Sequence, residues 1–307
     1  MNNLPIGEDI GYSSTKVRYN GKNVKFPTAI CFATDIGTTY GEADVYEFEG
    51  DTYYVGKDAV SQESFSTTDY KFLYKFGPLL TYHVLKKFNE HSLEKPVDLQ
   101  TGLAITDWHN MKEFKKRMSS IEVNGEKIDL NVKIIPQGAG VIMDYVFNEN
   151  NGQFPERICA IDIGHNTINF ISFKDGKPVR SEVKGYPGHG VTSILKPFTT
   201  YLENTFSLSF SEQEAIGIFV KGSFKFNGKE QVEVGEKIVE IKKQFVKKLF
   251  NSVLVNDKKV MGLADTVLLA GGGSLLLADV NFPQENIIKV EDPVFANVRG
   301  YMTWNVE

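Results

Sequence analysis

The stretch IGEDIGYSSTK, residues 6–16, contains an Asp-x-Gly that recurs later in the chain within IDIGHNTIN, residues 161–169. Asp9 of the first copy aligns with Asp162 of the second at an offset of 153 positions. In each copy an apolar run precedes the Asp-x-Gly, and a second apolar run and a Gly-Lys turn follow it. Because a strand, a tight turn and a second strand indicate a hairpin, the repeat predicts two related halves that each open on a hairpin.

Outward from the two hairpins, apolar and β-branched runs alternate with segments of helical periodicity, which is the pattern of an α/β fold. We expect strands over residues 4–11, 16–19, 23–33, 44–49, 52–55, 96–105, 157–164, 167–173, 178–184 and 266–270, and a hairpin within residues 120–135 that turns at Asn124-Gly125. We expect helices over residues 70–91, 108–118, 138–147, 191–206 and 232–255, and one more that opens at 271–273. Gly77-Pro78 is expected to kink or restart the first of these helices.

The polar stretch NENNGQFP at Asn148–Pro155 separates the two halves. Clustered Asn, Gly and Pro are typical of a connection between domains. We therefore predict a first domain over residues 1–150 and a second over residues 151–290. The segment 291–307 is predicted to return to the first domain and close it.

Composition excludes several classes of protein. The 307 residues carry 34 Lys and Arg against 39 Asp and Glu, a net charge of −5, and 41% are hydrophobic. These values are typical of a globular chain and exclude a disordered chain, a collagen or a disulfide scaffold. The acidic balance disfavours direct nucleic-acid binding, because such surfaces are usually basic. We interpret Cys31 and Cys159, which lie in apolar runs, as buried thiols of a reducing compartment.

The sequence contains no motif typical of membrane insertion, secretion or metal binding. No apolar stretch reaches the ~20 residues that span a bilayer, and Met1–Asn3 does not begin a secretory signal. We therefore expect a cytoplasmic protein without a membrane partner. The five histidines and two cysteines form no HExxH or CxxC pattern, so no metal site built by the protein alone is expected.

The Asp-x-Gly turns suit a magnesium–phosphate ligand. Glycine lets the backbone approach a phosphate, whereas a carboxylate beside a phosphate must act through Mg²⁺ or its bound water. Asp9 and Asp162 are the candidates for that role, with an ordinary Asp-capped turn as the alternative. Lys16 is placed to reach a β- or γ-phosphate, unless it is a solvated surface lysine. Asn169 stands at the matching position of the second half, so only one half offers a cation.

Two further glycine-rich turns follow predicted strands. Gly271, Gly272, Gly273 and Ser274 remove side chains where a flat ring or a phosphate could lie, although tight packing or a helix cap explains such glycines equally well. Neither GxGxxG nor GxxxxGK[ST] occurs in the chain. In Pro136–Gly140, the uncharged Gln137 could orient an attacking water, or simply face solvent at a helix start.

Two candidates lie at predicted helix starts. Gly188 and Gly190 flank His189 just before a helix, where backbone N–H groups suit a phosphate or ribose contact. His189 is either catalytic or a solvent-facing loop residue. Ser211–Glu214 reads as a capping box, with a nucleotide contact by Glu214 as the alternative.

Along the chain, the first Asp-x-Gly hairpin, the Pro136–Gly140 segment, the second hairpin and the Gly271–Gly273 turn follow one another. Motifs in this order resemble those of the superfamily of actin, the heat-shock chaperone ATPases and the sugar kinases. Within it, IIPQGAG at 134–140, the GYxxTK start and FANVRGY at Phe295–Tyr301 resemble the prokaryotic actin-like ATPases, of the ParM/StbA plasmid-segregation type and the short archaeal actin-like type. The resemblance covers essentially the whole chain. It implies an α/β actin-like ATPase fold, with two duplicated ribonuclease H-like domains around a nucleotide cleft.

The resemblance also implies roles for individual residues. Asp9 would order Mg²⁺ and its waters, Gln137 would position the hydrolytic water, and Asp162 would polarise that water or a metal-bound one. Contacts to ATP would come from Gly11, Tyr12, Ser13, Ser14 and Lys16 in the first loop, from Gly164, His165 and Asn166 in the second, and from Gly271 to Ser274 at the adenosine.

Two residues depart from the family pattern. Glu8 stands where the first strand usually carries an aliphatic residue, and we expect it to line the cleft or to be partly exposed, since burying an unpaired carboxylate is costly. Asn169 replaces an acidic residue.

The leading hypothesis is an ATPase that binds Mg²⁺ and ATP and polymerises into filaments for DNA or plasmid segregation. Its partners would be copies of itself and a DNA-binding adaptor. The alternatives are a small-molecule kinase of the same fold and a nucleotide-binding regulator without turnover. The residues leave ATP and GTP equally open.

Overall fold

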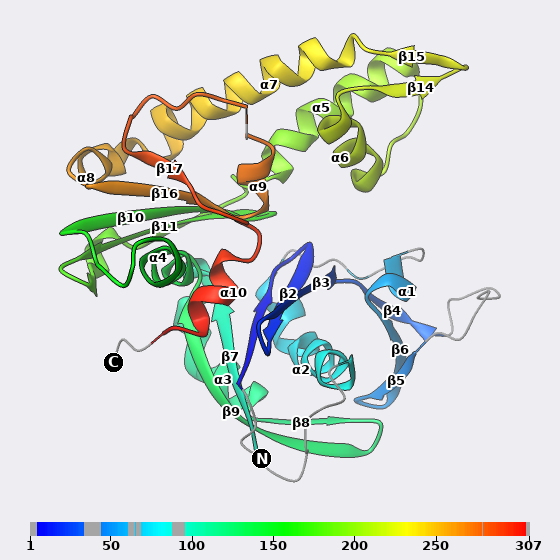
Figure 1. Ribbon diagram of the computed structural model, residues 1–307. Helices are drawn as coiled ribbons and strands as arrows, with labels where there is room; N and C mark the ends of the chain where they lie inside the picture. The colour runs from blue at the N-terminus through cyan, green and yellow to red at the C-terminus, as the bar shows by residue number, and fades with distance from the viewer. Residues whose placement is uncertain are drawn as a thin grey trace. The chain divides into compact units, whose positions relative to one another are not determined.

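Two units of the chain each form around their own sheet (Figure 1). The computed structural model describes residues 5–33, 44–60, 65, 69–87, 96–277 and 279–304. The first unit consists of Met1–Gln153 and Val294–Glu307, and the second of Phe154–Pro293. The domain boundaries predicted from the sequence, after residue 150 and after residue 290, remain predictions.

The sheet of the first unit has the strand order β3-β2-β1-β7-β9-β8. Its strands are β1 (Ile6–Ile10), β2 (Ser14–Tyr19), β3 (Lys22–Pro27), β7 (Val97–Leu103), β8 (Ser120–Val123) and β9 (Glu126–Pro136). Strands β1, β7 and β9 run parallel, whereas β2 and β3 extend the sheet antiparallel from β1. Between residues 127 and 133 of β9, buried and exposed residues alternate, as expected for a strand with one face in the core.

Helices α2 (Tyr70–Lys87) and α3 (Met111–Met118) belong to the core of this unit. A 3₁₀ turn, η2 (Ile105–Asn110), connects β7 to α3. A smaller sheet of the order β4-β6-β5 is formed by β4 (Ile30–Phe32), β5 (Val45–Phe48) and β6 (Asp51–Val55), and the short helix α1 (Lys57–Val60) follows it.

The sheet of the second unit repeats the path of the first. Its strand order is β12-β11-β10-β16-β17, formed by β10 (Arg157–Ile163), β11 (Thr167–Lys174), β12 (Lys177–Pro178), β16 (Thr266–Ala270) and β17 (Ile287–Lys289), with β13 (Lys184–Pro187) paired to β11. Strands β10, β16 and β17 are parallel, and β11 and β12 follow antiparallel, as in the first unit. The two units therefore share one α/β topology, in agreement with the sequence repeat.

Helices and one further hairpin complete the second unit. They are α5 (Thr192–Phe206), α6 (Glu212–Lys221), α7 (Val234–Lys248), α8 (Lys258–Gly262) and α9 (Gly272–Leu275), with the hairpin β14 (Phe224–Phe226) and β15 (Lys229–Gln231). Apolar residues of α7 at helical spacing, among them Ile238, Ile241 and Phe245, are buried in the core of this unit.

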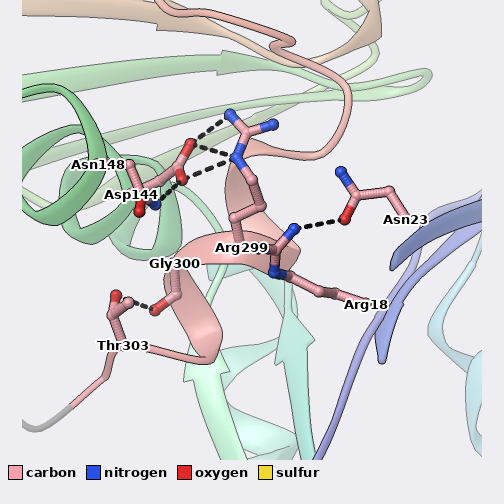
Figure 2. Close-up of polar contacts among 7 residues, drawn as sticks. All are labelled: Arg18, Asn23, Asp144, Asn148, Arg299, Gly300 and Thr303. Atoms are coloured by element: carbon pink, nitrogen blue, oxygen red, sulfur yellow. Dashed lines mark hydrogen bonds and ion pairs between the residues drawn. The ribbon is translucent and has the colours of Figure 1, made fainter. Parts of the chain in front are cut away.

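The C-terminal helix α10 (Ala296–Tyr301) packs within the first unit against α4 (Ala139–Asp144). The two backbones touch, because a Cβ built on Gly300 would lie only 1.7 Å from the carbonyl oxygen of Gly140. Figure 2 shows the guanidinium of Arg299 beside the carboxylate of Asp144, with Nε 2.8 Å from Oδ1. Burial raises the pKa of Asp144, and the hydrogen bonds that it accepts from Arg299 and Asn148 oppose that rise.

Several predicted elements are wrong in detail. The run 23–33 is two strands in two different sheets, because Pro27 has no N–H to continue the ladder and the N–H of Thr28 donates to Ser13. The predicted strand 178–184 is replaced by β12, a 3₁₀ turn (Arg180–Glu182) and β13. The N–H of Val179 still donates to the carbonyl oxygen of Ser172 beyond Pro178, and Arg157 holds the turn that follows through two hydrogen bonds to Glu182.

The predicted helices differ mainly at their ends. One helix, α2, continues through Gly77 and Pro78 without restarting, and residues 88–91 of the predicted helix lie outside the described residues, as does residue 4 of the first predicted strand. Helices α4 and α7 each continue into a π-helical turn, η3 (Tyr145–Glu149) and η5 (Leu249–Val253). Neither β17 nor the hairpin β14–β15 is among the predicted elements, although Asn227-Gly228, a typical hairpin turn, connects β14 to β15.

Candidate functional site

Three predicted site residues of the first unit lie together at the end of β1. Asp9 is buried, with 4% of its surface exposed. It pairs in register with Lys16 on β2, whose Nζ lies 3.3 Å from Oδ2 of Asp9. The side-chain amide of Gln137 donates to Oδ1 of the same carboxylate at 2.8 Å. A carboxylate, an ammonium and an amide from three elements thus converge on one point.

The turn between β1 and β2 places a glycine directly beside the ammonium of Lys16. The N–H of Gly11 donates to the carbonyl oxygen of Ser14 at 3.2 Å, which closes the turn. A Cβ built on Gly11 would lie 2.6 Å from Nζ of Lys16, so any larger residue would displace the ammonium. The carbonyl oxygen of Ser13 accepts from Thr28, and the hydroxyl of Tyr12 donates to Oδ2 of Asp107 at 3.1 Å. The turn therefore carries a glycine next to an ammonium, and an ammonium is a common charge partner of phosphate.

Gln137 lies between β9 and α4. Its backbone N–H donates to the carbonyl oxygen of Leu103 at 3.0 Å, and Gly138 follows with a φ of +89°. The N–H of Gly138 donates to Oδ1 of Asn297 on α10, and the hydroxyl of Tyr301 lies 3.4 Å from Oδ1 of Asp9. Helix α10 thus supports both Asp9 and the segment that carries Gln137. Sequence reasoning missed these roles of Asn297 and Tyr301, although both belong to the FANVRGY motif.

The second Asp-x-Gly forms the same turn with different neighbours. The N–H of Gly164 donates to the carbonyl oxygen of Thr167 at 2.9 Å, the equivalent of the Gly11 contact. Asp162, 4% exposed, pairs in register with Asn169 on β11, so no lysine faces it there. The loop 188–191 lies against this turn, where a Cβ built on Gly190 would be 2.4 Å from the carbonyl oxygen of Gly164. The structure therefore brings the predicted Gly188–Gly190 and Gly164–Asn166 segments together.

The three glycines after β16 differ in how closely other atoms approach the position of a Cβ. A Cβ on Gly271, whose φ is +82°, would lie 2.4 Å from the carbonyl oxygen of Ile163 and 2.5 Å from Oδ1 of Asp162. A Cβ on Gly273 would lie 2.2 Å from Cγ2 of Ile163, whereas no described atom lies within 4 Å of a Cβ on Gly272. Ser274 is buried and donates to the carbonyl oxygen of Gly271. Close packing thus accounts for Gly271 and Gly273, and the adenosine contact of this segment stays a prediction.

Glu214 lies at the start of α6 and closes the cap predicted there. Its carboxylate accepts from the N–H and the hydroxyl of Ser211, while Ser211 accepts from the N–H of Glu214. A nucleotide contact by Glu214 stays a prediction. Nearby, Nε2 of His165 lies 3.3 Å from Oε1 of Glu212. Partial burial and the charge of Lys248 lower the pKa of His189.

Glu8 is fully buried, so the expectation of partial exposure is wrong. Because successive residues of a strand point to opposite faces, Glu8 points away from the face of Asp9. Thr81 of α2 donates to its Oε2 at 2.6 Å, and its Oε1 has no hydrogen-bond partner among the described residues. Burial raises the pKa of Glu8 to about 8, so the carboxyl holds a proton at neutral pH.

Family models match both units. The model of the N-terminal domain of actin-like proteins matches residues 7–140, and that of the C-terminal domain of the archaeal MreB-like actin homologue matches residues 160–280. A search of the curated proteins gave no match. None of the helices in the described ranges combines the length and hydropathy that a membrane crossing requires.

Solved structures show the same fold. An archaeal actin homologue, Ta0583, is 20% identical with a TM-score of 0.77, and the alignment covers 97% of this chain and 98% of that one. A ParM from a 15-stranded filament of Clostridium botulinum is 19% identical with a TM-score of 0.79, over 98% of both chains. A Bacillus thuringiensis ParM with ADP is 17% identical with a TM-score of 0.68, again over 98% of both.

Proposed function

Since this chain is an actin-like protein, we propose that it binds a magnesium nucleotide, hydrolyses it and assembles into nucleotide-dependent filaments. The observation that carries the proposal is the convergence of Lys16 and Gln137 on the buried carboxylate of Asp9. The nucleotide-bound neighbours, Ta0583 with ADP and the Bacillus thuringiensis ParM with ADP, support it by analogy of fold.

The residues present fit a magnesium nucleotide. The ammonium of Lys16, which lies where a Cβ on Gly11 would be, would neutralise the charge of a phosphate oxygen. In the described part of the chain no group of three or more His, Cys, Asp or Glu side chains is placed to hold a metal ion directly. Mg²⁺ would therefore be held by the phosphates and by waters ordered by Asp9 and Asp162, which is its usual preference. When bound, Mg²⁺ supplies neutralisation of charge on the phosphates.

Gln137 is suited to orient water. Its amide is uncharged, so it does not compete for the cation, and the bond to Asp9 and the backbone bond of Gln137 to Leu103 limit where the amide can point. Asp162, in the turn of the second unit, would polarise the water. On this proposal each unit would supply one phosphate-binding loop and one carboxylate, and Lys16 and Gln137 of the first unit would supply the cation and the water-orienting amide.

Filament formation is supported by the fold shared with ParM from a filament. The partners of this chain would be its own copies and a DNA-binding adaptor in plasmid or DNA segregation. The net charge of −5 favours an adaptor over direct contact with DNA.

Sedimentation tests the filament. The purified chain is incubated with Mg²⁺ and ATP, GTP or ADP over a range of concentrations and centrifuged. We expect a pelleted fraction that requires a triphosphate and appears above a critical concentration. A chain that stays monomeric under all these conditions would contradict filament assembly.

Phosphate release tests the enzyme. Gln137→Ala should lower the rate by about 10²-fold, the size expected for loss of a water-orienting or polarising group. Gln244→Ala is the matched control, because that amide is exposed on α7 and bonds only to Glu240 among the described residues. Equal rates for wild type and Gln137→Ala would favour the regulator without turnover, and phosphate transfer to an added sugar would favour the kinase.

A further inference from the structure

In both units, the residue that follows the glycine of the Asp-x-Gly has a ring side chain with a polar atom at its end. Tyr12 and His165 are related by the offset of 153 positions. The polar atom of each ring lies close to a carboxylate of the same unit, and that carboxylate belongs to an element outside the hairpin. The hydroxyl of Tyr12 lies 3.1 Å from Oδ2 of Asp107, and Nε2 of His165 lies 3.3 Å from Oε1 of Glu212. The backbone turns beside them are also equivalent, so a contact as well as a turn is duplicated.

The contact in the first unit ties the turn to the segment after a neighbouring strand. Asp107 lies in η2, directly after β7, and β7 is the parallel neighbour of β1. The ring of Tyr12 packs against the apolar core of this unit. Burial is the largest cause of a raised pKa of Tyr12, so the hydroxyl stays protonated and donates to the carboxylate. A turn held by its own side chain loses little freedom when a ligand binds.

The contact in the second unit ties the turn to a helix start. Glu212 is the first residue of α6, whose cap is completed by Ser211 and Glu214. The N-terminus of a helix stabilises a carboxylate, which keeps Glu212 available as an acceptor. The side chain of His165 is 13% exposed and that of Glu212 is 48% exposed, so water competes with this contact more than with the first.

We propose that Tyr12–Asp107 and His165–Glu212 are a duplicated pair of positioning contacts, one in each unit, which hold the two turns in the conformation that binds nucleotide phosphate. The inference rests on the proposed function. None of the four side chains is a catalytic residue: each acts on the backbone of a turn. Their removal should therefore weaken nucleotide binding more than the removal of a similar contact elsewhere in the same unit does.

The experiment measures ADP affinity by calorimetry, and melting temperature as a control for stability, for single and double variants. Tyr12→Phe and Asp107→Asn should each weaken ADP binding about tenfold, and the double variant should lose no more than either single one, because both remove the same contact. His165→Leu and Glu212→Gln should each weaken it about threefold, given the exposure of the pair. His165→Gln, which retains a side-chain N–H donor, should restore part of the affinity.

Matched controls separate positioning from stability. Tyr82→Phe removes a hydroxyl–carboxylate bond of the same kind, 2.8 Å from Tyr82 to Glu126, and Lys237→Gln removes an exposed ion pair with Glu240. Both should leave ADP affinity unchanged, whatever they do to the melting temperature.

The outcomes distinguish the two proposals. If the wild-type chain binds no nucleotide, the proposed function and this inference both fail. If it binds nucleotide and the four variants bind as the wild type does, only the inference fails. Additive losses in the Tyr12 and Asp107 double variant, or losses matched by Tyr82→Phe, would also overturn it.

Discussion

The turns that follow β1 and β10 share a backbone and differ in chemistry. In both, a buried Asp precedes a glycine whose N–H closes the turn. Asp9 then meets Lys16 and Gln137, whereas Asp162 faces Asn169 and is packed against Gly271. The comparison teaches that one turn geometry occurs twice in the chain, with Lys16 opposite the carboxylate in the first copy and Asn169 opposite it in the second.

The largest expected effect comes from filling the space beside the second carboxylate. Gly271→Ala would force a Cβ to within 2.4 Å of the carbonyl oxygen of Ile163 at a φ of +82°. We expect a loss of about 3–5 kcal/mol in the free energy of unfolding of the second unit, from overpacking together with backbone strain. Gly272→Ala is the control, because no described atom lies within 4 Å of its Cβ. Urea denaturation measures both, and equal losses would contradict this account of the packing.

The next prediction concerns Glu8, which aligns with the buried Ile161 of the second copy. Burial raises the pKa of Glu8 from 4.5 to about 8, so the folded chain holds a proton that the unfolded chain releases. The contribution of Glu8 to stability is thus fully present below pH 4.5 and is lost as the pH rises towards 8. Glu8→Gln keeps an acceptor for Thr81 and does not titrate.

Relative to the wild type, Glu8→Gln should therefore gain about 3 kcal/mol between pH 5 and pH 8. Urea denaturation at the two pH values, without nucleotide, measures the difference. A gain that is the same at both would show that Glu8 is ionised in the folded chain.

Lys16→Asn makes the first turn resemble the second, where Asn169 faces the carboxylate. On the proposed function, the loss of a charge-assisted contact should weaken ATP binding by roughly 1.5–3 kcal/mol. Calorimetry with ATP and Mg²⁺ measures it. Lys25→Asn on β3, an exposed lysine opposite Lys16 in register, is the control. Equal affinity for wild type and Lys16→Asn would assign the lysine to a structural contact with Asp9 alone.

The smallest effect is expected for Glu214→Gln. Since its carboxylate is engaged with Ser211 at the start of α6, the substitution should lower the melting temperature slightly and leave ADP affinity unchanged. Thermal melting and calorimetry test the two parts. A clear loss of ADP affinity would instead support the nucleotide contact of Glu214 that sequence reasoning left open.

Much of the site geometry followed from local pattern. The offset between Asp9 and Asp162 predicted two equivalent hairpins, and the seven-residue step to Lys16 was enough to place it across the bend. Local pattern was insufficient at Pro27, where the ladder between β2 and β3 ends although the run that follows is still apolar. It was also insufficient for Glu8, since the burial of a charged residue depends on what packs over its strand, here α2 with Thr81.

Residues 6–16 and 161–169 by themselves were sufficient to predict the duplicated topology, because strand periodicity and turn chemistry act over a few residues. The partners of those turns were decided by packing between segments far apart in the chain. Tyr301 reaches Asp9 from α10, Gln137 reaches it from the end of β9, and Glu212 reaches His165 from α6. Such contacts depend on how sheets and helices bury their apolar faces, and no local spacing encodes them.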